Sequence, residues 1–218
     1  MSSIEQAITA LQYGGVVVYP LLLMGVVAVV IVIEKAYLHN LHGKPPVSLI
    51  ELVETFGFSW KDMEERLKSA PGKNHFVRFF SAIVGSRGKP VWWVESRAAD
   101  EALAIEKSMN RWLWILETIV TAAPLMGLIG TIVGMMDAFK LIGSNELVSP
   151  TGITAGVAQA LIATALGLVI ALIALFAFNY FSHLHTSVLD DMERLGSRVV
   201  DRIRMDEGER REEEYETA

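Results

Sequence analysis

The stretch ETIVTAAPLMGLIGTIVGMMDAFK, residues 117–140, has the length and composition of a membrane span. Its 19 residues between Glu117 and Asp137 carry no charge, and an α-helix needs about 20 apolar residues to cross a bilayer. Small residues interrupt the apolar ones, and in lipid such residues let two helix backbones approach closely. The stretch therefore predicts a transmembrane helix that packs against another helix. The small residues expected at this contact are Gly127, Gly130 and Gly134.

Two further uncharged runs predict two more spans. GGVVVYPLLLMGVVAVVIVI covers residues 14–33, and residues 153–181 hold no ionisable side chain except Tyr180. Small residues recur in steps of four in the last run and predict close packing there too. They are Gly156, Ala160 and Thr164, and again Ala163, Gly167 and Ala171. With 52% hydrophobic residues, the sequence predicts an all-α polytopic membrane protein with three transmembrane helices.

The chain divides into seven predicted segments. They are a periplasmic amino-terminal segment (1–13), a first transmembrane helix (14–34), a cytoplasmic helical domain (35–113), a second transmembrane helix (114–140), a periplasmic loop (141–152), a third transmembrane helix (153–181) and a cytoplasmic helix with a charged tail (182–218). The long inner helices are expected to extend into the cytoplasm. Residues 91–114 contain no helix breaker, so an unbroken helix should enter the second span. The tail from residue 205 is expected to be disordered.

The distribution of Lys and Arg predicts the orientation of the chain. None precedes the first span, 12 lie between the first and second spans, Lys140 ends the second, and 6 follow the third. Because cytoplasmic segments carry the excess of basic residues, the amino terminus and the 141–152 loop should be periplasmic. The first span is rich in Val, Ile and Leu and should face lipid, while the other two form the inner wall of an oligomer. Cysteines at Gly130 and Ala163 are then expected to cross-link neighbouring subunits.

Two threonines stand out because of their predicted depth. Thr131 lies nine residues before Lys140, and Thr164 lies ten residues after Thr154. At 1.5 Å per residue both lie about 14 to 15 Å below the outer surface, so they should share a level. Gln159 would lie about 8 Å below that surface. Two interpretations remain open: a polar pore lining, or hydroxyls that bond only to the preceding turn of their own helix.

These motifs resemble those of the MotA/TolQ/ExbB proton-channel family. APLMGLIGTIVGMMDAF (123–139) is similar to the family signature, and GVAQALIATALGLVIAL (156–172) is similar to its third-helix motif. The first span also resembles that of ExbB-like members, and three spans with a large domain between the first two look like the ExbB/TolQ branch.

The resemblance implies an inner-membrane homopentamer that encloses ExbD/TolR-like single-span partners and acts on a TonB- or TolA-like protein. It further implies a proton-channel motor that uses the proton motive force for biopolymer transport. The family's paired pore threonines correspond to Thr131 and Thr164, whereas Gln159 stands where a glutamate is frequent. No Asp, Glu, His, Lys or Arg lies within residues 14–33, 118–136 or 153–181, so the intramembrane Asp must come from the partner. A purely structural membrane scaffold is the alternative, and a solute transporter is disfavoured by the small number of spans.

Other candidate sites are weaker. Glu117 is a candidate proton exit, although a headgroup-level charge is the plainer interpretation. The pairs His39/His42 and His183/His185 could suggest a metal site, but histidines near a membrane exit are more often solvated. The absence of cysteine excludes disulfides and thiolate chemistry. We expect no enzyme activity, no cofactor, no metal and no nucleic-acid partner, with membrane lipids as the surroundings.

Overall fold

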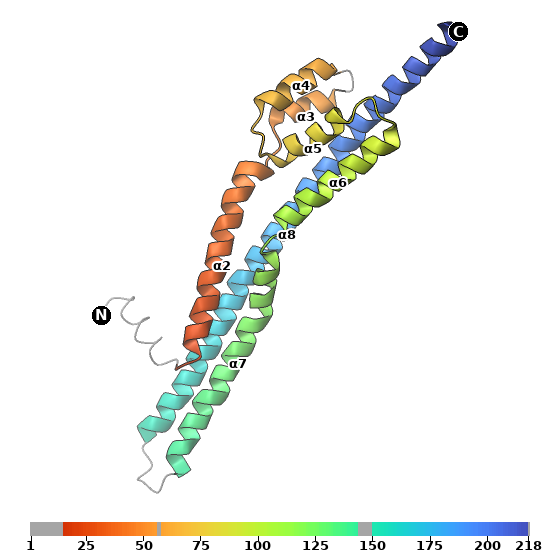
Figure 1. Cartoon of the computed structure of the whole chain (residues 1–218). Coiled ribbons are helices and arrows are strands. Elements are labelled where there is room, and N and C mark those ends of the chain that lie inside the picture. Colours follow the sequence, from red (N-terminus) through yellow and green to blue (C-terminus); the bar gives the residue numbers. More distant parts are fainter. Residues whose placement is uncertain (1–14, 56–57, 144–149, 218) are drawn as a thin grey trace. The chain divides into compact units, whose positions relative to one another are not determined.

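The computed structural model describes residues 15–55, 58–143 and 150–217, and every regular element in these ranges is a helix (Figure 1). The predicted segment 1–13 and residues 144–149 of the predicted loop lie outside the described residues. The chain forms two compact units. The first contains the chain up to Glu34 together with Trp112–Phe181, and the second contains Lys35–Arg111 together with Ser182–Ala218.

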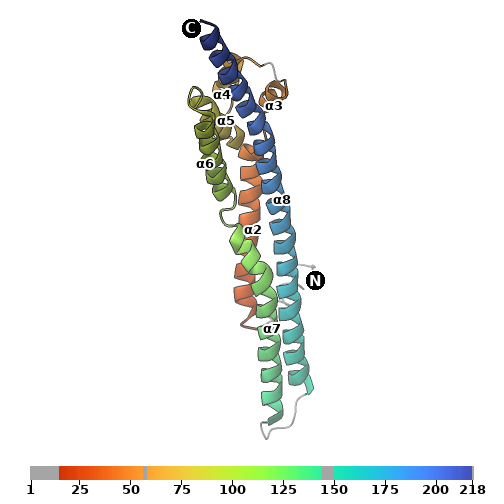
Figure 2. The ribbon, with the colours of Figure 1, turned by 90° about the vertical axis from the view of Figure 1, so that its right-hand side faces the viewer.

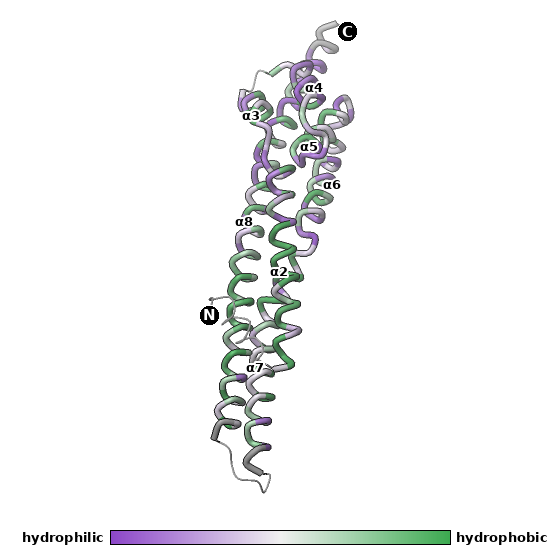
Figure 3. Tube along the Cα trace, turned by 90° about the vertical axis from the view of Figure 1, so that its left-hand side faces the viewer, coloured by the Kyte–Doolittle hydropathy of each residue, from purple (hydrophilic) through white to green (hydrophobic). Residues whose placement is uncertain are grey.

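Three helices are long and apolar enough to cross a membrane, as the sequence predicts. They are α2 (Val18–Leu38), α7 (Leu113–Gly143) and α8 (Pro150–Thr217). Hydrophobic residues dominate α2 and the amino-terminal half of α8, whereas hydrophilic residues are frequent in the carboxyl-terminal half of α8 (Figure 3). The chain is therefore an all-α protein with three membrane spans.

Helix α2 begins at a turn that requires glycine. Gly15 has a φ of +70°, a conformation that side chains other than glycine rarely adopt, and its carbonyl accepts a hydrogen bond from the Val18 N–H at 3.2 Å. Pro20 falls in the first turn of α2, where its missing N–H breaks no helical hydrogen bond. Further along, Leu23, Val26 and Ile33 are exposed, which suits a helix with one face toward lipid.

Within the first unit, α7 and the amino-terminal half of α8 run antiparallel and side by side (Figure 1, Figure 2). Helix α2 contacts α8, and Val17 just before α2 contacts α7. The Ile170 side chain lies 3.5 Å from where a methyl group at Gly25 would stand, and Val17 lies 3.6 Å from the corresponding position at Gly130.

The second unit is a small helical domain. Its elements are the π-helix η1 (His39–Gly43), α3 (Val47–Glu54), α4 (Trp60–Ser69), α5 (His75–Gly85), α6 (Val91–Met109) and the carboxyl-terminal half of α8. Residues 47–70 form two of these helices, α3 and α4. Phe76, Phe80 and Ile105 are fully buried in the core.

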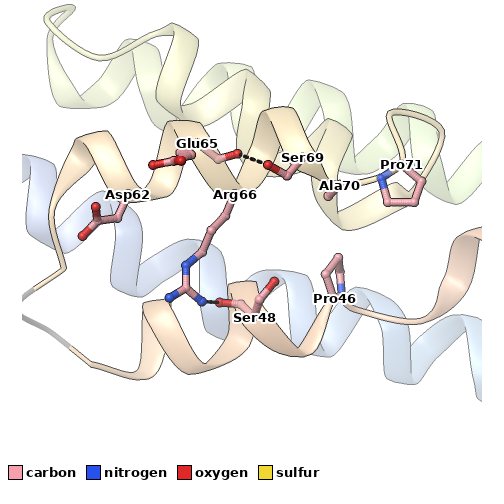
Figure 4. A pocket seen from close by; sticks show the side chains of 8 residues that line it. All are labelled: Pro46, Ser48, Asp62, Glu65, Arg66, Ser69, Ala70 and Pro71. Atoms are coloured by element: carbon pink, nitrogen blue, oxygen red, sulfur yellow. Dashed lines mark hydrogen bonds between the residues drawn. The ribbon is translucent and has the colours of Figure 1, made fainter.

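Polar contacts connect the helices of this second unit. Arg66 extends from α4 and donates a hydrogen bond to the Ser48 carbonyl on α3, at the edge of a cavity of about 530 Å³ (Figure 4). The indole N–H of Trp60 donates to Asp206 on α8 at 2.6 Å.

The predicted unbroken helix from residue 91 into the second span is wrong. Helix α6 ends at Met109, α7 begins at Leu113, and Trp112 between them has a φ of +69°. The side chain of Asn110 at the end of α6 lies 3.2 Å from Nδ1 of His185 on α8. This long-range contact stabilises a break that local sequence does not show.

The disordered tail predicted from residue 205 is also not observed, because α8 continues to Thr217. Arg and Glu are good helix formers, and residues four positions apart interact on a helix surface. Arg202 forms such an ion pair with Asp206 at 3.2 Å, and Arg210 donates to the Asp206 carbonyl at 3.2 Å. Local propensity and these contacts extend the helix into the charged tail.

Candidate functional site in the membrane helices

Helices α7 and α8 meet along a line of small residues that we call the glycine seam. A methyl group at Gly134 would lie 2.8 Å from the Gly156 carbonyl, and one at Gly167 would lie 2.5 Å from the Ala123 carbonyl. Both distances are too short for a carbon atom, so the two backbones are nearly in contact. The seam consists of Gly127, Gly130, Gly134, Gly156, Ala160, Ala163 and Gly167, the residues in which the sequence pattern places helix packing.

The seam lies inside one chain, which changes one prediction. A methyl group at Gly130 would lie 2.4 Å from the Ala163 Cβ of the same chain, and Ala163 is completely buried. Cysteines at these two positions would therefore report packing within a subunit. The prediction that this pair of cysteines cross-links neighbouring subunits is therefore wrong.

Thr164 participates directly in this contact. Its hydroxyl donates a hydrogen bond to the Gly127 carbonyl on α7 at 3.0 Å. The close approach at Gly127 makes this bond possible, because a methyl group there would lie 3.0 Å from the Thr164 Cα. The interpretation that both threonines bond only within their own helix does not hold for Thr164.

Thr131 makes a different bond. Its hydroxyl donates to the Leu128 carbonyl of its own helix at 2.6 Å, so back-bonding does describe this residue. Thr164 lies opposite Gly127, which precedes Thr131 by four residues, or about 6 Å along the helix. The two threonines are offset by about one helical turn. The prediction that they share a level is therefore wrong.

What we call the polar face of α7 carries Glu117, Thr121 and Thr131, with Pro124 and Leu128 between the two threonines. Residues 117, 121, 124, 128 and 131 are spaced by three and four, so their side chains lie on one side of the helix. Glu117 and Thr121 are exposed and Thr131 is partly exposed in the single chain. The Thr121 hydroxyl donates to the Thr118 carbonyl at 3.0 Å and keeps its lone pairs as acceptors. Thr121 is not among the site residues predicted from the sequence, although its spacing from Glu117 places it on the same face of α7.

Gln159 is not brought together with the two threonines. Its amide nitrogen lies where a methyl group at Gly15 would stand, at the turn before α2. Gln159 and Thr164 are five residues apart on α8, so they point to different faces of that helix. The structure thus places Gln159 at the contact with the first span.

The described ranges contain no group of three or more His, Cys, Asp or Glu side chains that could hold a metal ion. His183 is exposed, whereas His185, two residues later, is buried.

The chain is similar in sequence to a known protein family and to several individual proteins. The model of the MotA/TolQ/ExbB proton channel family matches residues 71–194. The chain is 29% identical over 177 residues to the ExbB-like 3 biopolymer transport protein of Synechocystis, covering 79% of this chain and 83% of the relative. It is 37% identical over 114 residues to the biopolymer transport protein ExbB of Xanthomonas campestris, covering 47% of this chain and 45% of the relative. It is 36% identical over 77 residues to the Tol-Pal system protein TolQ of Pseudomonas aeruginosa, covering 35% of this chain and 33% of the relative.

Proposed function

Because the chain belongs to the MotA/TolQ/ExbB proton channel family, whose members are channel and transport subunits and not enzymes, we propose that it is the ExbB/TolQ-like subunit of a bacterial inner-membrane proton channel. In this proposal the channel couples the proton motive force to work on a periplasmic or outer-membrane partner. The segment boundaries predicted from the sequence, with the amino terminus in the periplasm, are part of the proposal.

The observation that carries the proposal is the polar face of α7. A helix that serves only as a lipid-facing anchor has no use for Glu117, Thr121 and Thr131 on its exposed side, because polar groups are costly in hydrocarbon. A water-containing path or a partner helix with a polar group would stabilise them. This face favours the channel subunit over the scaffold, whereas the glycine seam serves either function.

The chain cannot complete a proton path by itself. Its three uncharged runs contain no group that holds a proton as a charge at ordinary pH. We therefore assign the intramembrane Asp to an ExbD/TolR-like single-span partner, with the hydroxyls of Thr131 and Thr164 orienting water or bonding to that carboxyl group. Each proton that crosses supplies about 2.3 kcal/mol per 100 mV of membrane potential.

The proposed assembly is a homopentamer around this partner, with a TonB- or TolA-like protein as the recipient of the work. Large apolar side chains remain exposed on both inner helices of the single chain, among them Ile132, Leu161 and Leu168. These surfaces are available for neighbouring subunits as well as for lipid.

The test is proton flux in liposomes. The chain is purified with and without the single-span protein encoded beside it, its oligomeric state is measured by native mass spectrometry, and proton uptake is followed under an imposed potential. We expect flux only when both proteins are present, and its loss when the partner's intramembrane Asp is replaced by Asn. Equal flux through this chain alone, or an assembled two-protein complex without any flux, would overturn the proposal.

A further inference from the structure

Four of the chain's five histidines line one small cavity in the second unit. The cavity has a volume of about 100 Å³. Its ionisable lining residues come from separate segments: Lys35 from α2, His39 and His42 from η1, His75 from α5 and His185 from α8. Apart from His39 and His42, these histidines are far apart in the sequence, so their convergence depends on the fold.

Local structure holds the rings in place. Two histidines lie on a π-helix, a rare element that is frequent at functional sites. The side chain of Asn74 accepts a hydrogen bond from the Phe76 N–H at 2.9 Å and donates one to the Lys44 carbonyl at 2.7 Å. This double contact fixes the start of α5 beside η1, where the rings of His42 and His75 have their centroids 6.0 Å apart.

The ionisable groups that line the cavity are all basic. Lys35 is only 3% exposed, and its ammonium group donates to the Met109 carbonyl at 2.6 Å. Lys44 and Arg78 lie nearby and add positive charge, although Arg78 is paired with the carboxylate of Glu101 at 2.6 Å. These cations disfavour a bound metal ion and favour an anion.

His75 and His185 are neutral near pH 7 and can act as hydrogen-bond donors. Burial, followed by the charges of His42, Arg78 and His39, lowers the pKa of His75 to about 4. Burial, followed by Lys35, His39 and His75, lowers the pKa of His185 to about 4. The Nδ1 atom of His75 is buried and has no hydrogen-bond partner among the described residues. A buried polar atom without a partner is unfavourable, so the cavity is suited to a polar occupant.

We propose that this cavity binds a phosphate group and that binding is accompanied by proton uptake on its histidines. The volume equals that of about three water molecules at ~30 Å³ each, which suits a small oxyanion with little hydration. Imidazole N–H groups and an ammonium group reach the cavity from several directions, and an oxyanion offers several acceptors. A negative charge among these basic groups favours the imidazolium form, because opposite charges stabilise each other.

The phosphate group could be supplied by a lipid headgroup or by free phosphate. Lys35 directly follows the predicted first span (14–34), and His185 lies four residues after the predicted third span (153–181). Headgroup phosphates are found at this boundary of a membrane. The proposal does not depend on proton-channel activity.

The test is isothermal titration calorimetry of the full chain with inorganic phosphate, in delipidated detergent and in buffers of different ionisation heat. We expect one saturable site and net proton uptake. For each proton taken up, the Kd for phosphate should fall about tenfold when the pH is lowered by one unit. The same titration in nanodiscs separates the two sources. Binding that persists in galactolipid discs but disappears in phosphatidylglycerol discs identifies the headgroup, whereas equal binding in both identifies free phosphate.

Variants make the assignment specific. Lys35→Met should weaken phosphate binding at least tenfold, while Lys68→Met, an exposed lysine of the same unit, should leave it unchanged. If Lys35→Met fails to fold, the double variant His39→Gln/His42→Gln, at two partly exposed residues, should reduce proton uptake. His183→Gln is the matched control, since His183 lies outside the cavity. No saturable binding at pH 6, or binding and proton uptake unchanged in the cavity variants, would overturn the proposal.

Discussion

The hydroxyl of Thr164 donates a hydrogen bond across the helix interface to the carbonyl of Gly127, 3.0 Å away. The bond exists because Gly127 has no side chain at the point where the backbones of α7 and α8 approach. Thr131 lies one turn further along α7 and bonds to Leu128 of its own helix. The two threonines are therefore not equivalent: Thr164 contributes to helix packing, and Thr131 does not.

This difference predicts different effects of two valine substitutions. Thr164→Val should destabilise the subunit by about 0.6 to 2 kcal/mol, the range for an interhelical hydrogen bond in a membrane. Thr131→Val should leave stability nearly unchanged, yet both should lower proton flux in the complex with the partner. Thermal unfolding in detergent measures the first effect and liposome flux the second. Thr164→Ser retains the hydroxyl and should retain stability; equal destabilisation by both valines would contradict the assignment.

The glycine seam predicts an effect of a single methyl group. Gly167→Ala would bring a carbon to 2.5 Å from the Ala123 carbonyl, so the helices must separate and the subunit should lose stability. Gly208→Ala is the matched control on the same helix, because a methyl group there meets no atom within 4 Å. The control should gain about 0.5 to 1 kcal/mol, since alanine is the better helix former. Similar melting temperatures of the two variants would exclude close packing at the seam.

The turn at Gly15 predicts a second effect of a methyl group. In Gly15→Ala the new methyl group would be strained by the positive φ and would also overlap the Gln159 side chain. In Gly88→Ala the φ of +88° is also unfavourable, but the methyl group would meet no atom within 4 Å. The positive φ costs about 1 to 2 kcal/mol in either variant. Because only Gly15→Ala adds the overlap with Gln159, it should be the more destabilising of the two. The additional variant Gln159→Leu should affect flux less than either threonine variant, because Gln159 lies against the turn before α2. Thermal unfolding and flux measurements test these two points, and a larger loss in Gly88→Ala would disprove the Gly15–Gln159 overlap.

The sequence predicts the features that depend on a local pattern of residues. It does not predict features that depend on contacts between distant segments. Uncharged runs and the spacing of small residues identify three spans, because both signals are contained within one helix. The break at Trp112 depends on a contact between Asn110 and His185, which are 75 residues apart. The acceptor of Thr164 and the histidine cavity likewise require the packing of separate segments. Equal depth of two threonines could be estimated from distances to the span ends, but a register error of one turn lies within that estimate.

The buried histidines predict a loss of stability in acid. The pKa of His75 and of His185 is about 4 in the fold and near 6.5 in an unfolded chain. Between these values the unfolded chain binds more protons, so stability is full above about pH 6.5 and declines as the pH falls toward 4. Melting temperatures in phosphate-free buffer from pH 7.5 to 5 measure the decline. His75→Gln should flatten the slope and exposed His183→Gln should not; identical slopes in all three proteins would show that His75 titrates normally.

The polar face of α7 predicts that Glu117 and Thr121 act in proton transfer. Glu117→Gln removes the only carboxyl group of that face, and Thr121→Val removes a hydroxyl one turn away. If protons leave along this face, each substitution should lower flux through the assembled complex about tenfold, which corresponds to ~1.4 kcal/mol in the barrier. Thr186→Val is the matched control, because that exposed threonine bonds to its own helix at Ser182 but lies beyond the predicted span. Native mass spectrometry must show that each variant assembles. Unchanged flux in Glu117→Gln would identify Glu117 as an ordinary headgroup-level charge, and would restrict the proposed proton path in this chain to Thr131 and Thr164.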